Sequence, residues 1–153
     1  MLFRSPLVGK IIRKVAIARF TRTFSALIGA GVAVLEALDV TARAVGNTVY
    51  EESLKNAAKR VQSGEVLSKI IAEDEELYPP IVAQMLSVGE ETGQTDKVLV
   101  KVADFYEEEV DTAIDSISSI IEPVMIVFMG GMVGLVAASV MMPITGLAQQ
   151  IKS

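Results

Sequence analysis

The chain has 153 residues, and its 14 basic and 19 acidic side chains give a formal net charge of −5. It contains no Cys and no His, which excludes disulfide frameworks, Cys/His zinc sites, thiol nucleophiles and proton shuttles through imidazole. A hydrolase would then need lysine- or carboxylate-based chemistry, and no such group is framed by a recognisable motif. The sequence therefore predicts that the protein is not an enzyme and holds no cofactor.

Helical periodicity dominates the first 92 residues, and no stretch alternates convincingly like a β-strand. Thr48, with Glu51 three residues later, predicts a capping-box start for the third helix. Pro79 and Pro80 predict the start of the fifth, because proline costs nothing in the first turn of a helix. The acidic run at 73–78 is expected to be a frayed helix end and a loop. The predicted helices cover residues 13–28, 34–44, 48–63, 65–72 and 79–92.

A sixth and longest helix is predicted from Asp96 onward. Its apolar positions step by three and four residues, the spacing of a helix packed into a bundle: Leu99, Val102, Tyr106, Val110, Ala113, Ile117 and Ile120. The opposite face forms an acidic stripe: Asp104, Glu108, Asp111, Asp115 and Glu122. Three interpretations are open: a solvated face, as charge runs usually are, a docking face for a basic partner, or a divalent-cation site. As a docking face, the stripe would make its contacts through Asp104, Glu108 and Asp111.

The segment 89–93, GEETG, predicts a helix C-terminus closed by Gly93. It lacks the lysine and the spacing of a phosphate-binding loop. Acidic residues at a helix C-terminus oppose the helix dipole, at a cost of about 0.3–1 kcal/mol each. Glu90 and Glu91 are therefore expected to serve contacts elsewhere.

The segment 123–142 carries no charge and is apolar on every side. At about 1.5 Å per residue it spans roughly 30 Å, the thickness of a bilayer's hydrocarbon core. Gly130 and Gly134 have the GxxxG spacing that lets membrane helices approach closely, although glycine is also common in such helices. Pro123 either kinks the helix or marks its re-start. We expect a transmembrane helix that packs on another through Glu122, Pro123, Gly130 and Gly134.

Thirteen of the 14 Lys and Arg residues precede this apolar segment. This bias favours a cytoplasmic domain and an extracytoplasmic C-terminus. The basic segment from Arg4 to Arg22 predicts contact with anionic lipid, and no nucleic-acid binding is expected because the rest of the domain is acidic. The expected organisation is a basic lead-in at the membrane surface, a helical domain, a transmembrane helix and a tail, at residues 1–14, 15–121, 122–146 and 147–153.

Several short motifs, in this order and over nearly all of the chain, resemble the type II secretion system protein F / PilC family. They are PLVGK at 6–10, RFTRTFS at 19–25, GVAVLEAL at 31–38, GEVL at 64–67, YPP at 78–80, MLSVGEETG at 85–93, ADFYEEEV at 103–110, EP at 122–123 and PI at 143–144. With the short helix connections, the resemblance implies an all-α fold. We expect an antiparallel six-helix cytoplasmic bundle whose last helix continues into a C-terminal transmembrane helix.

The resemblance implies an inner-membrane platform protein of type II secretion or type IV pilus assembly. Members link a hexameric cytoplasmic assembly ATPase to pilin or pseudopilin subunits, and other membrane components and further copies of the protein are expected partners. Glu90, Glu91 and Gly93 match the family's most recognisable motif and are expected to make partner or inter-domain contacts. Typical members are longer and carry two copies of the domain and three membrane helices, so the likeness is to their second half.

A second interpretation comes from a different class of protein. In it the chain is a regulatory adaptor with a single membrane anchor. Its acidic stripe would then bind a soluble partner.

Overall fold

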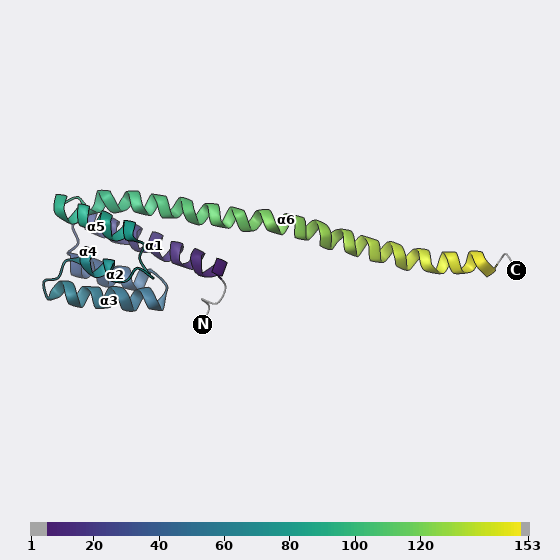
Figure 1. The fold of residues 1–153 in the computed structure, drawn as a ribbon, viewed down its shortest axis with the longest axis horizontal. Coiled ribbons are helices and arrows are strands. Elements are labelled where there is room, and N and C mark those ends of the chain that lie inside the picture. The colour runs from purple at the N-terminus through teal and green to yellow at the C-terminus, as the bar shows by residue number, and fades with distance from the viewer. Residues whose placement is uncertain (1–5, 151–153) are drawn as a thin grey trace. The chain divides into compact units, whose positions relative to one another are not determined.

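The computed structural model describes residues 6–150, and the side chains of residues 8–144. Within these residues the protein is helical and has no strand, which confirms the predicted all-α fold (Figure 1). The chain divides into a helical domain that ends at Asp111 and a helical segment that starts at Thr112. The helices of the described part are α1 (Pro6–Gly29), α2 (Val34–Ala44), α3 (Thr48–Gln62), α4 (Leu67–Ala72), α5 (Pro80–Thr92) and α6 (Thr95–Gln150).

The start of α1 and the N-cap of α3 differ from the prediction. Helix α1 begins at Pro6, because proline suits the first helical position, where its missing N–H would have had no partner inside the helix. The N-cap of α3 is Asn47 and not Thr48. The side-chain oxygen of Asn47 accepts from the backbone N–H groups of Val49 at 3.0 Å and Tyr50 at 3.5 Å. Asn ranks above Thr as an N-cap, so the neighbouring residue takes the role and the predicted capping box is wrong.

A cluster of buried aromatic rings lies at the centre of the domain. Phe20 and Phe24 of α1 stack with ring centroids 5.8 Å apart, and Tyr78, just before α5, meets Phe20 edge-on at 5.7 Å. Tyr50 of α3 meets Tyr78 edge-on at 5.5 Å. These are the ring arrangements that the aromatic quadrupole favours. The cluster therefore joins α1, α3 and the connection before α5, while α2 packs on both α1 and α3.

The connection between α4 and α5 is a loop, as predicted, and two other helices hold it in place. The Arg13 guanidinium of α1 donates to the backbone oxygens of Glu75 at 2.6 Å and Leu77 at 3.3 Å. The Tyr50 hydroxyl donates to the same Leu77 oxygen at 2.7 Å. Side chains distant in sequence thus fix the backbone that places Tyr78 in the core.

Tyr50 makes the domain sensitive to alkaline pH. Burial raises the pKa of Tyr50 to about 12, from a value of about 10 in an unfolded chain. Above about pH 10 the unfolded chain loses this proton first, so the folded state loses stability as the pH rises toward 12. We expect Tyr50→Phe to lower stability by about 1 kcal/mol at neutral pH, through the lost hydrogen bond, and to flatten the alkaline fall in melting temperature. Thermal melts followed by circular dichroism at 222 nm measure the stability at neutral pH and its fall at alkaline pH. The same alkaline fall in melting temperature in Tyr50→Phe as in the wild type would contradict the role given to Tyr50.

Helix α6 is buried only in its first part. In the domain, Leu99, Val102 and Tyr106 are buried, as their spacing predicted. The same spacing continues beyond the domain, but Ile117 and Ile120 are 41% and 65% exposed there. The amphipathic pattern is therefore longer than the surface that the domain supplies to cover it.

The apolar end of α6 is uninterrupted helix. It runs through Pro123 and Pro143, so the alternative in which Pro123 marks a re-start is wrong. A missing N–H removes a single intrahelical hydrogen bond, and the rest of the ladder continues. Among residues 6–150, α6 is the one helix long and apolar enough to cross a membrane by its length and composition.

Candidate partner-docking face

Ion pairs join α1 and α6 within the domain. The Arg22 guanidinium makes two hydrogen bonds to the Glu107 carboxylate, at 2.8 and 2.7 Å, and pairs with Asp104 at 2.5 Å. The ammonium of Lys14 lies 2.6 Å from a carboxylate oxygen of Glu109. Lys14, early in α1, pairs with Glu109, whereas Arg22, later in α1, pairs with residues that come before Glu109 in α6. The two helices therefore run antiparallel. The basic face of α1 thus lies on acidic residues of its own domain.

These pairs align the two helices more than they stabilise the domain. Arg22 and Glu107 are both partly exposed, and exposed pairs contribute little because water screens them. Hydrogen bonds from Arg22 nevertheless hold the pKa of Glu107 below its usual range. The contribution of Glu107 is therefore present above the unfolded carboxyl pKa and is lost as the pH falls through the lower folded value.

The structure divides the predicted acidic stripe. Asp104 is paired with Arg22, whereas Glu108 and Asp111 are exposed and form no hydrogen bond or ion pair with any described residue. No group of three Asp or Glu side chains within the described part of the chain is placed to hold a metal ion. Two of the three predicted contact residues are thus available to a basic partner.

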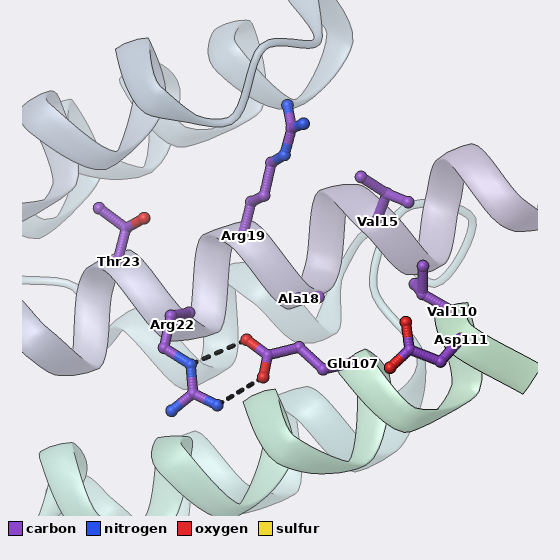
Figure 2. Close-up of a pocket in the computed structure, with 8 residues that line it drawn as sticks. All are labelled: Val15, Ala18, Arg19, Arg22, Thr23, Glu107, Val110 and Asp111. Atoms are coloured by element: carbon purple, nitrogen blue, oxygen red, sulfur yellow. Dashed lines mark hydrogen bonds and ion pairs between the residues drawn. The ribbon is translucent and has the colours of Figure 1, made fainter.

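A hollow of about 240 Å³ lies between α1 and α6, next to Asp111. Figure 2 shows Arg22 directed at Glu107 and Arg19 directed to the other side of α1. The unpaired Asp111 stands beside the aliphatic side chains of Val15, Ala18 and Val110, which can receive an apolar side chain next to a basic one. The residues that line the hollow are Val15, Ala18, Arg19, Arg22, Thr23, Glu107, Val110 and Asp111.

The segment 89–93 forms the corner between α5 and α6. Gly93 caps α5 with φ of 66°, a left-handed conformation that favours glycine, and its N–H donates to the oxygen of Gly89. The N–H of Gln94 donates to the same oxygen at 3.0 Å. A Cβ on Gly89 would lie 2.7 Å from the Cα of Thr95, the first residue of α6. The predicted cap at Gly93 is confirmed, and Gly89 is required for the approach of α6.

Glu90 reaches from this corner to the start of α4. Its two carboxylate oxygens lie 3.3 and 3.4 Å from the backbone nitrogen of Ser68, at the long end of hydrogen-bond distances. The residue before α4, Val66, offers no side-chain cap, so Glu90 supplies one from another helix. A carboxylate that is unfavourable at the C-terminus of α5 is favourable at the N-terminus of the preceding helix, α4. Glu91 is exposed, and among the residues that the structure describes it accepts a hydrogen bond only from Ser87, one turn earlier.

The predicted contact residues lie on separate surfaces. Glu108 follows Thr95 by 13 residues, which places the acidic stripe about 20 Å along α6 from the corner. The predicted membrane contacts, Glu122, Pro123, Gly130 and Gly134, all lie in the segment after Thr112. A Cβ on either glycine would meet no described atom within 4 Å, so nothing in the described structure packs there.

Sequence reasoning missed the α1–α6 ion pairs and the close approach at Gly89. One signal could have revealed the pairs: α1 is basic and contains no acid, while the predicted sixth helix has the opposite charge. Opposite charge on two amphipathic helices of one small domain indicates that they pair with each other. Nothing local in the sequence distinguishes Gly89 from a helix glycine without neighbours.

Comparisons with known proteins agree with one another over most of the chain. A family model described as type II secretion system (T2SS), protein F matches residues 20–143. The chain is 45% identical over 141 residues to the type IV pilus assembly protein PilC of Thermus thermophilus, which covers 92% of this chain and 35% of that protein. It is 44% identical over 147 residues to PilC of Myxococcus xanthus, covering 96% and 35%. It is 31% identical over 150 residues to the type II secretion system protein F of Pseudomonas aeruginosa, covering 98% and 37%. The chain thus spans little more than a third of the length of these relatives.

Proposed function

Because the chain belongs to the type II secretion system protein F family, we propose that it is a platform protein of a type IV pilus or type II secretion machine. In this role it couples a cytoplasmic assembly ATPase to the polymerisation of pilin or pseudopilin subunits, without catalysing a reaction itself. Proteins of the family are inner-membrane proteins, and α6 has the length and composition of a membrane span. The observation that carries the proposal is the family match, which extends from the domain through the apolar part of α6.

The proposed topology places residues 15–121 in the cytoplasm, the membrane span at residues 122–146 and the tail, residues 147–153, outside the cytoplasm. It is supported by the concentration of Lys and Arg before the apolar segment. The domain itself engages most of the cations of α1: Arg13, Lys14, Arg19 and Arg22 all bond to it. Within the described residues, Lys10 is the α1 cation left for anionic lipid, so the proposed surface contact of residues 1–14 centres on the start of α1.

The proposed contact with the ATPase uses the unpaired carboxylates of α6. Glu108 and Asp111 are exposed, and the hollow beside Asp111 offers an apolar surface at their side. An interface needs such an apolar anchor site, while unpaired charges select the partner and steer its approach. The corner with Glu91 and Gly93 is a second proposed contact, about 20 Å away. Glu90 is assigned a structural role at this corner, because its carboxylate caps α4.

Capture of the assembly ATPase from the same genome, in mild detergent, tests the proposal. We expect Glu108→Lys/Asp111→Lys to reduce the captured ATPase about tenfold, because it reverses the charge of the contact without touching an ion pair. The matched control is Glu52→Lys/Glu75→Lys, which changes the net charge equally at two exposed side chains, one on α3 and one in the connection between α4 and α5, and should capture like the wild type.

The remaining outcomes each have a clear meaning. If Glu108→Lys/Asp111→Lys leaves the capture unchanged but Glu91→Lys abolishes it, the ATPase contact lies at the corner between α5 and α6. Equal loss in the control would show a general charge effect and contradict a defined face. If the folded chain captures no ATPase, even with the rest of the relatives' length supplied in trans, the platform role is wrong and the regulatory adaptor is favoured.

A further inference from the structure

A second hollow between α1 and α6, which we call the basic hollow, carries the opposite charge to the hollow beside Asp111. It has a volume of about 290 Å³ and is lined by three cations of α1, Lys10, Arg13 and Lys14, and by one carboxylate, Glu109. None of its lining residues lines the hollow beside Asp111. The same two helices therefore form two separate hollows, one beside an unpaired carboxylate and the other beside cations.

One of the three cations of the basic hollow is neutralised by a carboxylate, because Lys14 pairs with Glu109 at 2.6 Å. Among the described residues, Arg13 donates only to two backbone oxygens, and a neutral carbonyl does not cancel its charge. Lys10 is exposed and forms no hydrogen bond or ion pair with any described residue. Glu76 lines a neighbouring hollow with Lys10 and Arg13 but makes no ion pair with either. Two positive charges are thus left without a carboxylate partner, and the carbonyl contacts hold Arg13 in place.

Apolar side chains line the basic hollow beside these cations. Ile17 and Tyr106 are buried, and Pro79 contributes from the connection before α5. Phe105 also lines the hollow, and its side chain is 53% exposed. The Phe105 ring meets the Tyr106 ring edge-on, with centroids 5.3 Å apart. An exposed aromatic ring next to unpaired cations can receive an apolar side chain and an acidic one together.

We propose that the basic hollow docks an acidic segment of a partner protein. An aspartate or glutamate of that segment meets Arg13 and Lys10, and a neighbouring apolar side chain packs on Phe105. The volume lies just below the range of small-molecule pockets, about 300–1,000 Å³, so it suits one or two side chains better than a cofactor. An apolar anchor site beside unpaired charge is the arrangement that holds a protein partner and selects it by its charge.

The position of Phe105 favours a protein over the membrane surface. Phe105 precedes Pro123 by 18 residues, which is about 27 Å of helix. With α6 crossing the membrane as proposed, the headgroup layer extends only about 5–8 Å beyond the hydrocarbon core. Lys10 can meet anionic lipid, as proposed above, or the acidic segment, so competition between the two ligands is part of the test.

Selection of peptides on the full chain in mild detergent tests the proposal. A phage library of random short peptides is first depleted on empty detergent micelles and then selected on the chain. The enriched peptides should carry an aspartate or glutamate next to leucine or an aromatic residue. They are then synthesised with a fluorescein label and titrated against variants of the full chain by fluorescence anisotropy.

Phe105→Glu should weaken the binding of these peptides about tenfold, because it removes the apolar anchor and adds a carboxylate that repels the acidic segment. Val100→Glu is the matched control. It adds the same charge at another exposed apolar residue of α6, outside the hollow, and should bind like the wild type. Glu108→Lys/Asp111→Lys should not weaken the binding, since neither residue lines the basic hollow. No step involves the ATPase, so failure of this contact and failure of the platform role are distinguished.

Several results would overturn the proposal. One is a selection that enriches no peptide, or peptides without acidic residues. Equal weakening by Phe105→Glu and Val100→Glu would show a general charge effect. Displacement of the peptides by phosphatidylglycerol added to the micelles would assign the hollow to anionic lipid. Binding that weakens as the concentration of the chain rises would assign it to a second copy.

Discussion

Phe20→Ala is expected to lower the free energy of unfolding of the domain by about 3–5 kcal/mol. The Phe20 ring is fully buried, stacks on Phe24 and meets the Tyr78 ring in an edge-to-face arrangement. Its removal leaves a cavity among residues from helices far apart in sequence, which cannot all relax into the space. In a domain of this size, the melting temperature in mild detergent should fall by about 12–20 °C, measured by circular dichroism at 222 nm.

Phe105→Ala is the matched control. Phe105 is a phenylalanine of the same domain, but its side chain is 53% exposed. Truncating it should change stability by no more than about 0.5 kcal/mol, since surface substitutions away from buried contacts rarely do more. Similar losses at both positions would show that the aromatic cluster is not the centre of the core.

Gly89→Val is expected to destabilise the domain by about 3 kcal/mol, near the upper end for an overpacked site. A Cβ at this position would lie 2.7 Å from the Cα of Thr95, and a backbone atom cannot move aside as the end of a side chain can. The start of α6 would have to shift, and with it the buried Leu99. A fall in melting temperature of about 12 °C is the expected result.

Two variants separate this steric effect from others. Gln84→Val places the same β-branched residue on the exposed side of α5, where only helix propensity changes, at a cost of about 0.5 kcal/mol. Gly93→Ala tests backbone strain at a position with φ of 66° and no atom near the added Cβ, and should cost about 1–2 kcal/mol. If Gly89→Val were no worse than Gln84→Val, the close approach of α5 and α6 would be refuted.

Features that depend on neighbouring residues were predictable from the sequence. The bounds of α2, the start of α5 at its two prolines and the cap at Gly93 are as predicted, because each depends on backbone preferences within one turn. The charge-free length of the last helix is also a property of composition alone. The N-cap of α3 was misplaced by one residue because Asn47 and Thr48 can both cap and only their competition decides.

The candidate contacts could be predicted only in part, because the sequence gives a helix face but not what covers it. The spacing of Asp104, Glu108 and Asp111 placed them on one stripe of α6. Only the folded domain shows that Asp104 is paired with Arg22, which lies 82 positions earlier in the chain. Glu108 and Asp111 remain exposed. Glu90 is similar: the dipole argument predicted a contact elsewhere, and the structure identifies the start of α4.

The sequence by itself determined the helical class, the order of the helices, the apolar span and the family, since all of these follow from local periodicity, composition and motif order. The tertiary structure decided which charges are paired, which glycine must lack a side chain (Gly89), and at which residue of α6 the apolar spacing is no longer buried by the domain. These features depend on distances between residues far apart in the chain, and such distances are fixed only when the core around Phe20 and Tyr78 has packed.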